Sequence, residues 1–338
     1  MKNKKIILVC IMMLLLTGCT TYLKDENKKN VTNPHTGQNL TENILCRPTD
    51  EETSKIYEEH DVDLSELPYC VCETDTYTDS VYTNGAYTEN EYNCESFSIT
   101  SGGYEGLWTN IFVKPLAWVI IFIGRYVNNF GIGLILTSLL IRIVAYPFTK
   151  KTAMQSELIK QAQPELNRLE KKYEKKDLND QQVMMMKSQE MMAIYKKYNI
   201  NPLSGCLFSL IQFPLFIAFL EAINRVPSIF EETFLGLHLG TSPMVGIKDG
   251  NYFYIIIIVI VGLSTYFSFK MNSKDMPAAN TSDMQNQTNT MMNVFMVMIT
   301  VMSLFMTSAL GIYWVTTNLF TIFQNLVVKR RSIKHEKI

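Results

Sequence analysis

The sequence predicts an all-α membrane protein with five transmembrane helices, a cytoplasmic helical hairpin and an N-terminal extracytoplasmic segment. Three observations support this fold class. Long apolar runs dominate residues 112–328, residues 20–105 are polar and acidic, and basic residues gather in one internal loop and in the tail. Because a helix needs about 20 apolar residues to cross the hydrocarbon core, only the second part of the chain can fill a bilayer.

Residues 1–18 have the pattern of a secretory signal peptide, with a basic start followed by the short apolar core Ile6–Leu16. Leu16–Cys19 resembles the bacterial lipobox, in which the cysteine thiol receives diacylglycerol and the signal is cut just before it. We therefore expect the mature chain to begin at Cys19 outside the cytoplasm. Diacylglycerol, with an optional N-acyl chain such as palmitate, would anchor it. The alternative is an ordinary signal peptide with a chance cysteine.

Residues 19–104 are expected to form a loosely structured, acidic extracytoplasmic segment, because aliphatic residues are few and no period is sustained. Alternating Tyr and Thr residues over 77–92 indicate a hairpin around Asn84-Gly85. An even number of cysteines in an oxidising compartment indicates disulfides. A bond between Cys70 and Cys72 would be strained, so the two other pairings are favoured, and free thiols are the alternative. No metal site is predicted, since no histidine lies at ligand spacing. The cysteines are Cys46, Cys70, Cys72 and Cys94.

An interfacial helix is predicted within residues 105–129, because Lys114 and Pro115 interrupt the apolar run and Trp108 and Trp118 suit the headgroup level. The five-span core follows over residues 130–328. Its last apolar run holds 38 residues without a charge. A single helix of that length would reach ~57 Å, so a turn near 308–311 is expected. The spans are predicted at about 130–148, 203–223, 252–269, 291–307 and 310–328.

Charge placement sets the orientation of these spans. The loop 149–201 and the tail 329–338 are rich in lysine and arginine, whereas the loop 225–251 holds only Arg225 and Lys248. Positive charge prefers the cytoplasm, so the basic loop and tail should both lie inside. An even number of crossings must separate them, and the split last run supplies it.

The loop 149–201 reads as a cytoplasmic helical hairpin with arms at 153–174 and 179–199, because both stretches are rich in good helix formers. Apolar positions recur along the first arm at three- and four-residue steps. A basic hairpin beside the membrane suits contact with a ribosome, RNA or acidic lipid. A solvated hairpin without a partner is the alternative.

Arg142 lies inside the first predicted span. A charge within a membrane helix is costly and marks function by default. Ser138, Arg142 and Tyr146 recur at steps of four and form a polar stripe on one helical face. Snorkelling of the arginine toward the cytoplasmic lysines is the alternative.

Other spans carry polar side chains that could complete this stripe. Gln212 lies in the second span, and Tyr313, Trp314 and Asn318 lie in the fifth. Such residues indicate either a water-filled cavity or hydrogen bonds between helices. The chain has no Walker loop, dinucleotide-binding glycine motif or zinc-protease signature. We therefore expect neither an enzyme nor a cofactor.

Residues 107–328 resemble the bacterial YidC membrane protein insertases, of the Gram-positive lipoprotein type. Five motifs carry this resemblance in order and spacing: Leu140–Arg142 with Tyr146-Pro147; Gln163–Glu165; Tyr198–Cys206; Ile211–Pro214; and Ile312–Trp314 with Asn318.

The resemblance implies a bundle around a hydrophilic groove that is open to the cytoplasm and lipid and closed toward the outside. Arg142 is then the groove charge that attracts acidic residues in the exported tail of a nascent membrane protein. The implied partners are nascent membrane proteins, the Sec translocon, membrane lipid, and a ribosome or the signal-recognition machinery at the hairpin and tail. The expected groove residues are Ser138, Arg142, Tyr146, Gln212, Tyr313, Trp314 and Asn318.

Two features depart from the family pattern. The exported segment is longer and richer in cysteine than expected. Ser268-Phe269 stand before Lys270 where relatives often carry a glutamine pair, which suggests a thinner polar lining. The alternatives of another class are a small-solute channel or transporter with a lipoprotein head, and a structural lipoprotein scaffold. A transporter should show paired intramembrane charges or repeats, which are not seen.

Overall fold

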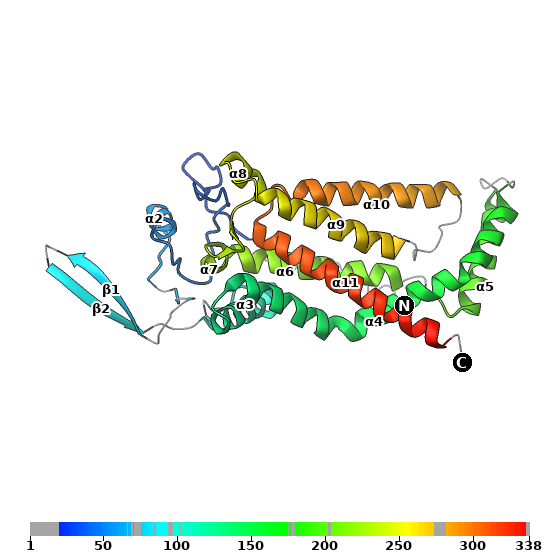
Figure 1. The fold of residues 1–338 in the computed structure, drawn as a ribbon, viewed down its shortest axis with the longest axis horizontal. Coiled ribbons are helices and arrows are strands. Elements are labelled where there is room, and N and C mark those ends of the chain that lie inside the picture. Colours follow the sequence, from blue (N-terminus) through cyan, green and yellow to red (C-terminus); the bar gives the residue numbers. More distant parts are fainter. Residues whose placement is uncertain are drawn as a thin grey trace. The chain divides into compact units, whose positions relative to one another are not determined.

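The computed structural model is mostly helical (Figure 1). It describes residues 20–65, 67–68, 70, 76–83, 86–93, 97–101, 103–174, 176, 180–201, 204–273 and 282–335. The chain forms two compact units. Unit 1 comprises Met1–Ser138, Phe213–Ile258 and Ser303–Tyr313, and unit 2 comprises Leu139–Gln212, Val259–Met302 and Trp314–Ile338. The predicted signal peptide and Cys19 lie outside the described residues.

The first part of unit 1 is a folded segment, which corrects the expectation of loose structure for residues 20–65. The helix α2 (Glu51–Glu59) begins at Asp50, whose carboxylate accepts a hydrogen bond from the Thr53 amide and so satisfies a free N–H of the first turn. The few aliphatic side chains of this segment converge on one partner from the loop 225–251. The resulting core is made of Leu23, Leu40, Ile44, Tyr57 and Phe230.

Hydrogen bonds hold this segment to the end of α6 (Ser204–Asn224). The Leu45 amide donates to the Arg225 carbonyl at 2.8 Å, and the Thr41 hydroxyl donates to the Asn224 carbonyl at 3.2 Å. Gly37 lies so close to Val245 that a Cβ atom there would come within 2.5 Å of its methyl group. The segment is therefore packed on the loop 225–251 rather than tethered loosely beside it.

Two strands form the hairpin that the Tyr and Thr alternation indicated. β1 (Thr76–Thr83) pairs antiparallel with β2 (Ala86–Asn93), with Thr83 opposite Ala86. That register leaves a two-residue connection, the commonest length for a hairpin. The predicted turn residues Asn84 and Gly85 themselves lie outside the described residues.

The entry to the helical part of unit 1 is a single π-turn, η1 (Thr109–Val113), followed by α3 (Lys114–Tyr126). These occupy the predicted interfacial helix. Where α3 meets α4, a Cβ atom on Gly133 would lie 2.8 Å from the Gly124 Cα atom. Only glycine permits this close approach of the two helix backbones. The loop 225–251 adds four short elements, α7 (Pro227–Phe230), β3 (Thr233–Phe234), β4 (Leu237–His238) and α8 (Pro243–Lys248).

The helix α4 (Phe130–Tyr173) runs for 44 residues from the first predicted span into the hairpin without a break (Figure 1). The sequence predicted a separate arm that starts at 153. No glycine lies between the two predicted pieces and Pro147 is accommodated within the helix, so nothing in this stretch ends it. The second arm, α5 (Gln181–Lys197), begins at the N-cap Asp180. The two arms share a core made of Ile159, Ala162, Leu166, Tyr195 and Ile200.

Three further long helices are α9 (Tyr254–Ser273), α10 (Ser282–Met302) and α11 (Ser308–His335). The last apolar run is therefore split, but at 303–307 instead of the expected 308–311. Ser308 begins α11 because its amide and its hydroxyl both donate to the Thr241 carbonyl, at 3.0 and 2.7 Å.

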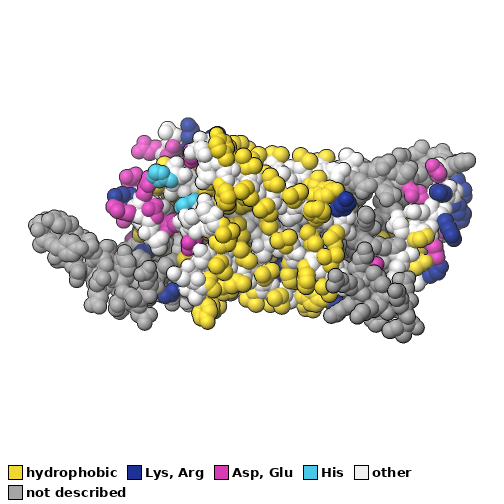
Figure 2. Space-filling model, viewed as in Figure 1, with side chains coloured by type: hydrophobic (Ala, Val, Ile, Leu, Met, Phe, Trp, Pro, Cys, Tyr) yellow, Lys and Arg dark blue, Asp and Glu magenta, His cyan; other side chains and the backbone are white. Residues whose placement is uncertain are grey.

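Two stretches of the described residues are long and apolar enough to cross a membrane, Phe130–Pro147 and Tyr254–Met271. Pro214–Asn224 and Asn293–Met302 are shorter apolar helices. Many of their large hydrophobic side chains are exposed, for example Leu263 and Phe267 on α9 and Val294 and Val301 on α10. Hydrophobic side chains accordingly cover much of the surface that faces the viewer in Figure 2. An exposed apolar surface of this extent is typical of contact with lipid.

Candidate functional site

Arg142 and Gln212 meet inside unit 2. α4 supplies the arginine and α6 supplies the glutamine, and the guanidinium Nη2 donates to the Gln212 Oε1 atom at 2.5 Å. Arg142 is only 5% exposed. Glutamine carries no charge, so this bond satisfies a donor without placing a negative charge beside the guanidinium. The structure therefore brings together two residues that lie 70 positions apart in the sequence.

The other two members of the predicted α4 stripe differ in their environment. Ser138 is buried and donates to the Leu134 carbonyl of its own helix at 2.7 Å. Such a bond satisfies a hydroxyl without any partner helix. Tyr146 is partly exposed, one turn beyond Arg142. The next turn carries Thr149, whose hydroxyl lies 3.1 Å from the Gln324 Oε1 atom of α11.

Trp314 and Asn318 lie one turn apart on α11 and are both held by α9. The Trp314 indole N–H donates to the Thr265 hydroxyl at 3.0 Å. The Asn318 amide nitrogen donates to the hydroxyls of Thr265 at 3.1 Å and Ser264 at 3.3 Å. Thr265 is fully buried, whereas Trp314 and Asn318 are partly exposed. We call these four residues the α9–α11 polar cluster.

Ser264 and Thr265 had no predicted role. The sequence indicated a thinner polar lining because Ser268-Phe269 replace a glutamine pair. Ser268 is buried, and the Phe269 ring stacks on Phe295 of α10 with centroids 5.8 Å apart. The hydroxyls that reach α11 are instead supplied one turn earlier on α9. A Ser-Thr pair in an apolar helix is a weak signal, since its hydroxyls often bond the helix itself.

Tyr313, another of the expected groove residues, lies in unit 1 and is buried. Its side chain is fully buried, and its ring stacks on Phe219 of α6 with centroids 4.2 Å apart. Tyr313 and Trp314 are neighbours in sequence and so point to different faces of α11. The matching motif Ile312–Trp314 could not show which of its aromatic residues is the buried one.

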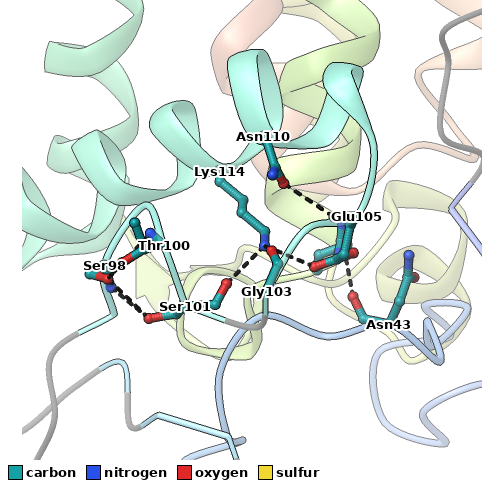
Figure 3. A network of polar contacts seen from close by, with 9 residues as sticks. Asn43, Ser98, Thr100, Ser101, Gly103, Glu105, Asn110 and Lys114 are labelled. Carbon is teal, nitrogen blue, oxygen red and sulfur yellow. Dashed lines mark hydrogen bonds and ion pairs between the residues drawn. The ribbon is translucent and has the colours of Figure 1, made fainter.

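A second polar cluster lies in unit 1 and is charged (Figure 3). The fully buried ammonium of Lys114 lies 3.2 Å from the Glu105 Oε1 atom and donates to the carbonyls of Ser101 and Gly103. The Arg225 guanidinium, 1% exposed, pairs with the other Glu105 oxygen. Its Nε atom also donates to the Asn43 carbonyl at 2.6 Å. We call Glu105, Lys114 and Arg225 the Glu105 clamp.

The Glu105 clamp explains two basic residues that the sequence left without a role. Lys114 appeared to interrupt the interfacial helix, and Arg225 was one of two positive charges in the loop 225–251. Both are buried because one carboxylate accepts from both. Buried charges are tolerated when they are paired and hydrogen-bonded.

Burial also shifts the pKa values of two side chains in the loop 225–251. It raises the pKa of the Glu231 carboxyl, although that group accepts hydrogen bonds from the Thr49 amide and hydroxyl. It lowers the pKa of His238 below the ordinary 6.5. In unit 2, Lys187 on α5 is buried and its pKa is lowered for the same reason.

Cys46 and Cys70 form a disulfide with their Cα atoms 5.5 Å apart. This belongs to one of the two pairings that the sequence favoured. Cys72 and Cys94 lie outside the described residues. Within the described ranges, no group of three or more histidine, cysteine, aspartate or glutamate side chains could hold a metal ion.

A model of the 60Kd inner membrane protein family matches residues 122–336, which contain Arg142, Gln212 and the α9–α11 polar cluster. The membrane protein insertase YidC of Oceanobacillus iheyensis is 35% identical over 67% of this chain and 85% of its own length. The membrane protein insertase MisCA of Bacillus subtilis is 34% identical over 67% of this chain and 81% of its own length. A crystal structure of an active YidC insertase aligns with 67% of this chain and 48% of that chain, at 21% identity and a TM-score of 0.47.

Proposed function

The chain belongs to the 60Kd inner membrane protein family, and we propose that it inserts and folds integral membrane proteins. In this proposal it works alone on small clients and beside the Sec translocon on larger ones. Relatives that are 34–35% identical over two-thirds of the chain are named membrane protein insertases. In this proposal insertion consumes no nucleotide and uses no cofactor.

The observation that carries the mechanism is the buried Arg142, bonded to a neutral amide. A client carboxylate at ~4 Å would be attracted by about 1 kcal/mol in bulk water but about 4 kcal/mol at an effective dielectric of 20. Burial therefore strengthens the attraction between Arg142 and an acidic exported tail, and this attraction offsets part of the cost of removing the tail's carboxylates from water. The client's apolar segment can then pass sideways into lipid, which is its favourable solvent.

We further propose that the first part of α4, with α6, α9, α10 and α11, spans the membrane five times. The apolar helices support this assignment. The basic loop 149–201 and tail support a cytoplasmic position for the hairpin and the C-terminus. The hairpin then lies where a ribosome or the signal-recognition machinery could bind it, and Cys19 lies outside, where diacylglycerol can anchor it.

The experiment that tests this proposal compares Arg142→Ala with Arg142→Lys in proteoliposomes. The client is a single-span protein with a short acidic exported tail, synthesised in vitro. Arg142→Ala should abolish insertion, and Arg142→Lys should largely preserve it, because a lysine keeps the charge. Protease protection of the exported tail measures insertion. Full activity of the alanine variant would exclude the groove charge as the driving contact.

A further inference from the structure

The α9–α11 polar cluster has a fixed hydrogen-bond direction. The Ser264 hydroxyl donates its single hydrogen to the Val261 carbonyl at 3.1 Å. Ser264 can therefore only accept from α11. The Trp314 indole nitrogen is a donor and never an acceptor, so Thr265 accepts from it. The two hydroxyls of α9 thus act as acceptors toward α11.

This direction settles how the Asn318 amide is turned. If the amide were flipped, its carbonyl oxygen would face the lone pairs of Ser264, and two acceptors would oppose each other. The orientation in the structure avoids this, because the amide nitrogen uses its two hydrogens on Ser264 and Thr265. The carbonyl oxygen Oδ1 is then the atom of Asn318 that can still accept a hydrogen bond.

Burial differs across the cluster in a way that suits a binding surface. Thr265 is fully buried and Ser264 is 6% exposed, while Asn318 and Trp314 are partly exposed. The anchoring hydroxyls therefore lie behind the residues that they hold. An acceptor that is fixed in place by its neighbours binds with little loss of side-chain entropy.

We propose that Asn318 offers its side-chain carbonyl oxygen to a backbone N–H of the client's exported segment, and that Ser264 and Thr265 are the positioning residues that aim it. This inference rests on the proposed insertase function. An extended segment that leaves water carries unpaired backbone N–H groups, which are costly to bury. A neutral acceptor compensates them without selecting side chains, so it serves clients of any sequence.

The test uses the full chain in proteoliposomes and two single-span clients. Their exported tails have equal length and charge, but alternate positions are alanine in one and proline in the other. Proline lacks the N–H. The wild type should insert the alanine client about fivefold faster than the proline client, which corresponds to one neutral hydrogen bond. The quantity measured is this ratio, compared between variants as in a double-mutant cycle.

Asn318→Leu should reduce the ratio to near one. Thr265→Val should reduce it in the same direction and should also shift the emission of Trp314, whereas Thr265→Ser should restore both. Thr137→Val is the matched control, because Thr137 is fully buried but bonds the Gly133 carbonyl of its own helix. Subtracting the spectrum of a Trp314→Phe partner isolates the Trp314 signal.

An unchanged ratio in an inserting Asn318→Leu variant would overturn the inference and leave the insertase function intact. Failure of the wild type to insert either client would overturn the proposed function itself, and the inference with it. If Asn318→Leu inserts neither client, Thr265→Val decides: an unchanged ratio there also overturns the inference.

Discussion

Each of the two units buries an arginine, but the side chains that bond these two arginines differ in charge. Arg225 in unit 1 is 1% exposed and pairs with the Glu105 carboxylate, which Lys114 also contacts. Arg142 in unit 2 is 5% exposed and bonds the neutral Gln212. In the Glu105 clamp, a negative carboxylate pairs with the positive arginine. The Gln212 amide holds the guanidinium through a hydrogen bond that adds no negative charge, which suits the proposed attraction of a client carboxylate.

This difference separates stability from function. Removing one partner of a buried ion pair leaves an uncompensated charge, which destabilises the fold strongly. Loss of the Arg142 side chain removes a bond to a neutral amide, and that amide carries no charge of its own. We therefore expect substitutions at the Glu105 clamp to change folding, and substitutions at Arg142 to change insertion.

The largest expected effect on stability is that of Glu105→Gln. It removes the carboxylate that two buried cations share, and we expect unit 1 to lose about 3 kcal/mol of unfolding free energy. Thermal unfolding and protease access to residues 20–65 measure the loss. Glu26→Gln, at an exposed carboxylate, is the control and should change neither. If Glu105→Gln keeps full stability yet blocks insertion as Arg142→Ala does, the assignment of stability to the clamp and of insertion to Arg142 is wrong.

A smaller effect is expected from the disulfide. Cys46 and Cys70 lie 24 positions apart, so their bond restricts the unfolded segment around α2. The double variant Cys46→Ser with Cys70→Ser should lose about 2 kcal/mol and should insert clients at the wild-type rate. Trypsin cleaves after Lys55, so an intact bond should hold the Cys46 and Cys70 peptides together as one mass until reduction separates them. An unchanged mass would show that the two thiols are free.

The smallest effect is a pH dependence at His238. Its pKa is lowered by burial, so the unfolded chain binds a proton near the ordinary value of 6.5 while the folded unit does not. Stability is therefore complete above this value and falls as the pH falls through it. His238→Gln should flatten this part of the curve.

The control for this prediction is the difference between the stability–pH curves of the wild type and of His238→Gln. The raised pKa of Glu231 acts with the opposite sign, because its protonation favours the folded unit as the pH falls. Both proteins keep Glu231, so subtracting their midpoints removes its contribution. Parallel curves between pH 7.5 and 5.5 would contradict a role for His238.

Local patterns in the sequence predicted most of the helices, since apolar period and length depend on neighbouring residues. The Tyr and Thr alternation likewise predicted β1 and β2. The first arm of the hairpin was misjudged at its start, because α4 continues through Pro147. The break before α11 was placed five residues too late, because contacts with Thr241 set where that helix begins.

Contacts between residues far apart in the chain could not be predicted from the sequence. Leu40 and Phe230 share a core across 190 positions, and no local period predicts such a pair. The same limit applies to the site. Arg142 and Gln212 could each be proposed from their residue type, but the Gln212 contact needed the structure. Ser264 and Thr265 were missed because a hydroxyl in an apolar helix has no fixed direction until its partner is known.

The position of Phe230 has a consequence for how the chain is made. The ribosome synthesises Leu40 about 190 residues before Phe230, a delay of roughly 10–40 s at ~5–20 residues per second. In the proposed topology, residues 20–65 reach the outside first and lack part of their core until the loop 225–251 has followed. A folded exported segment would then report that the protein has completed the insertion of its own first spans.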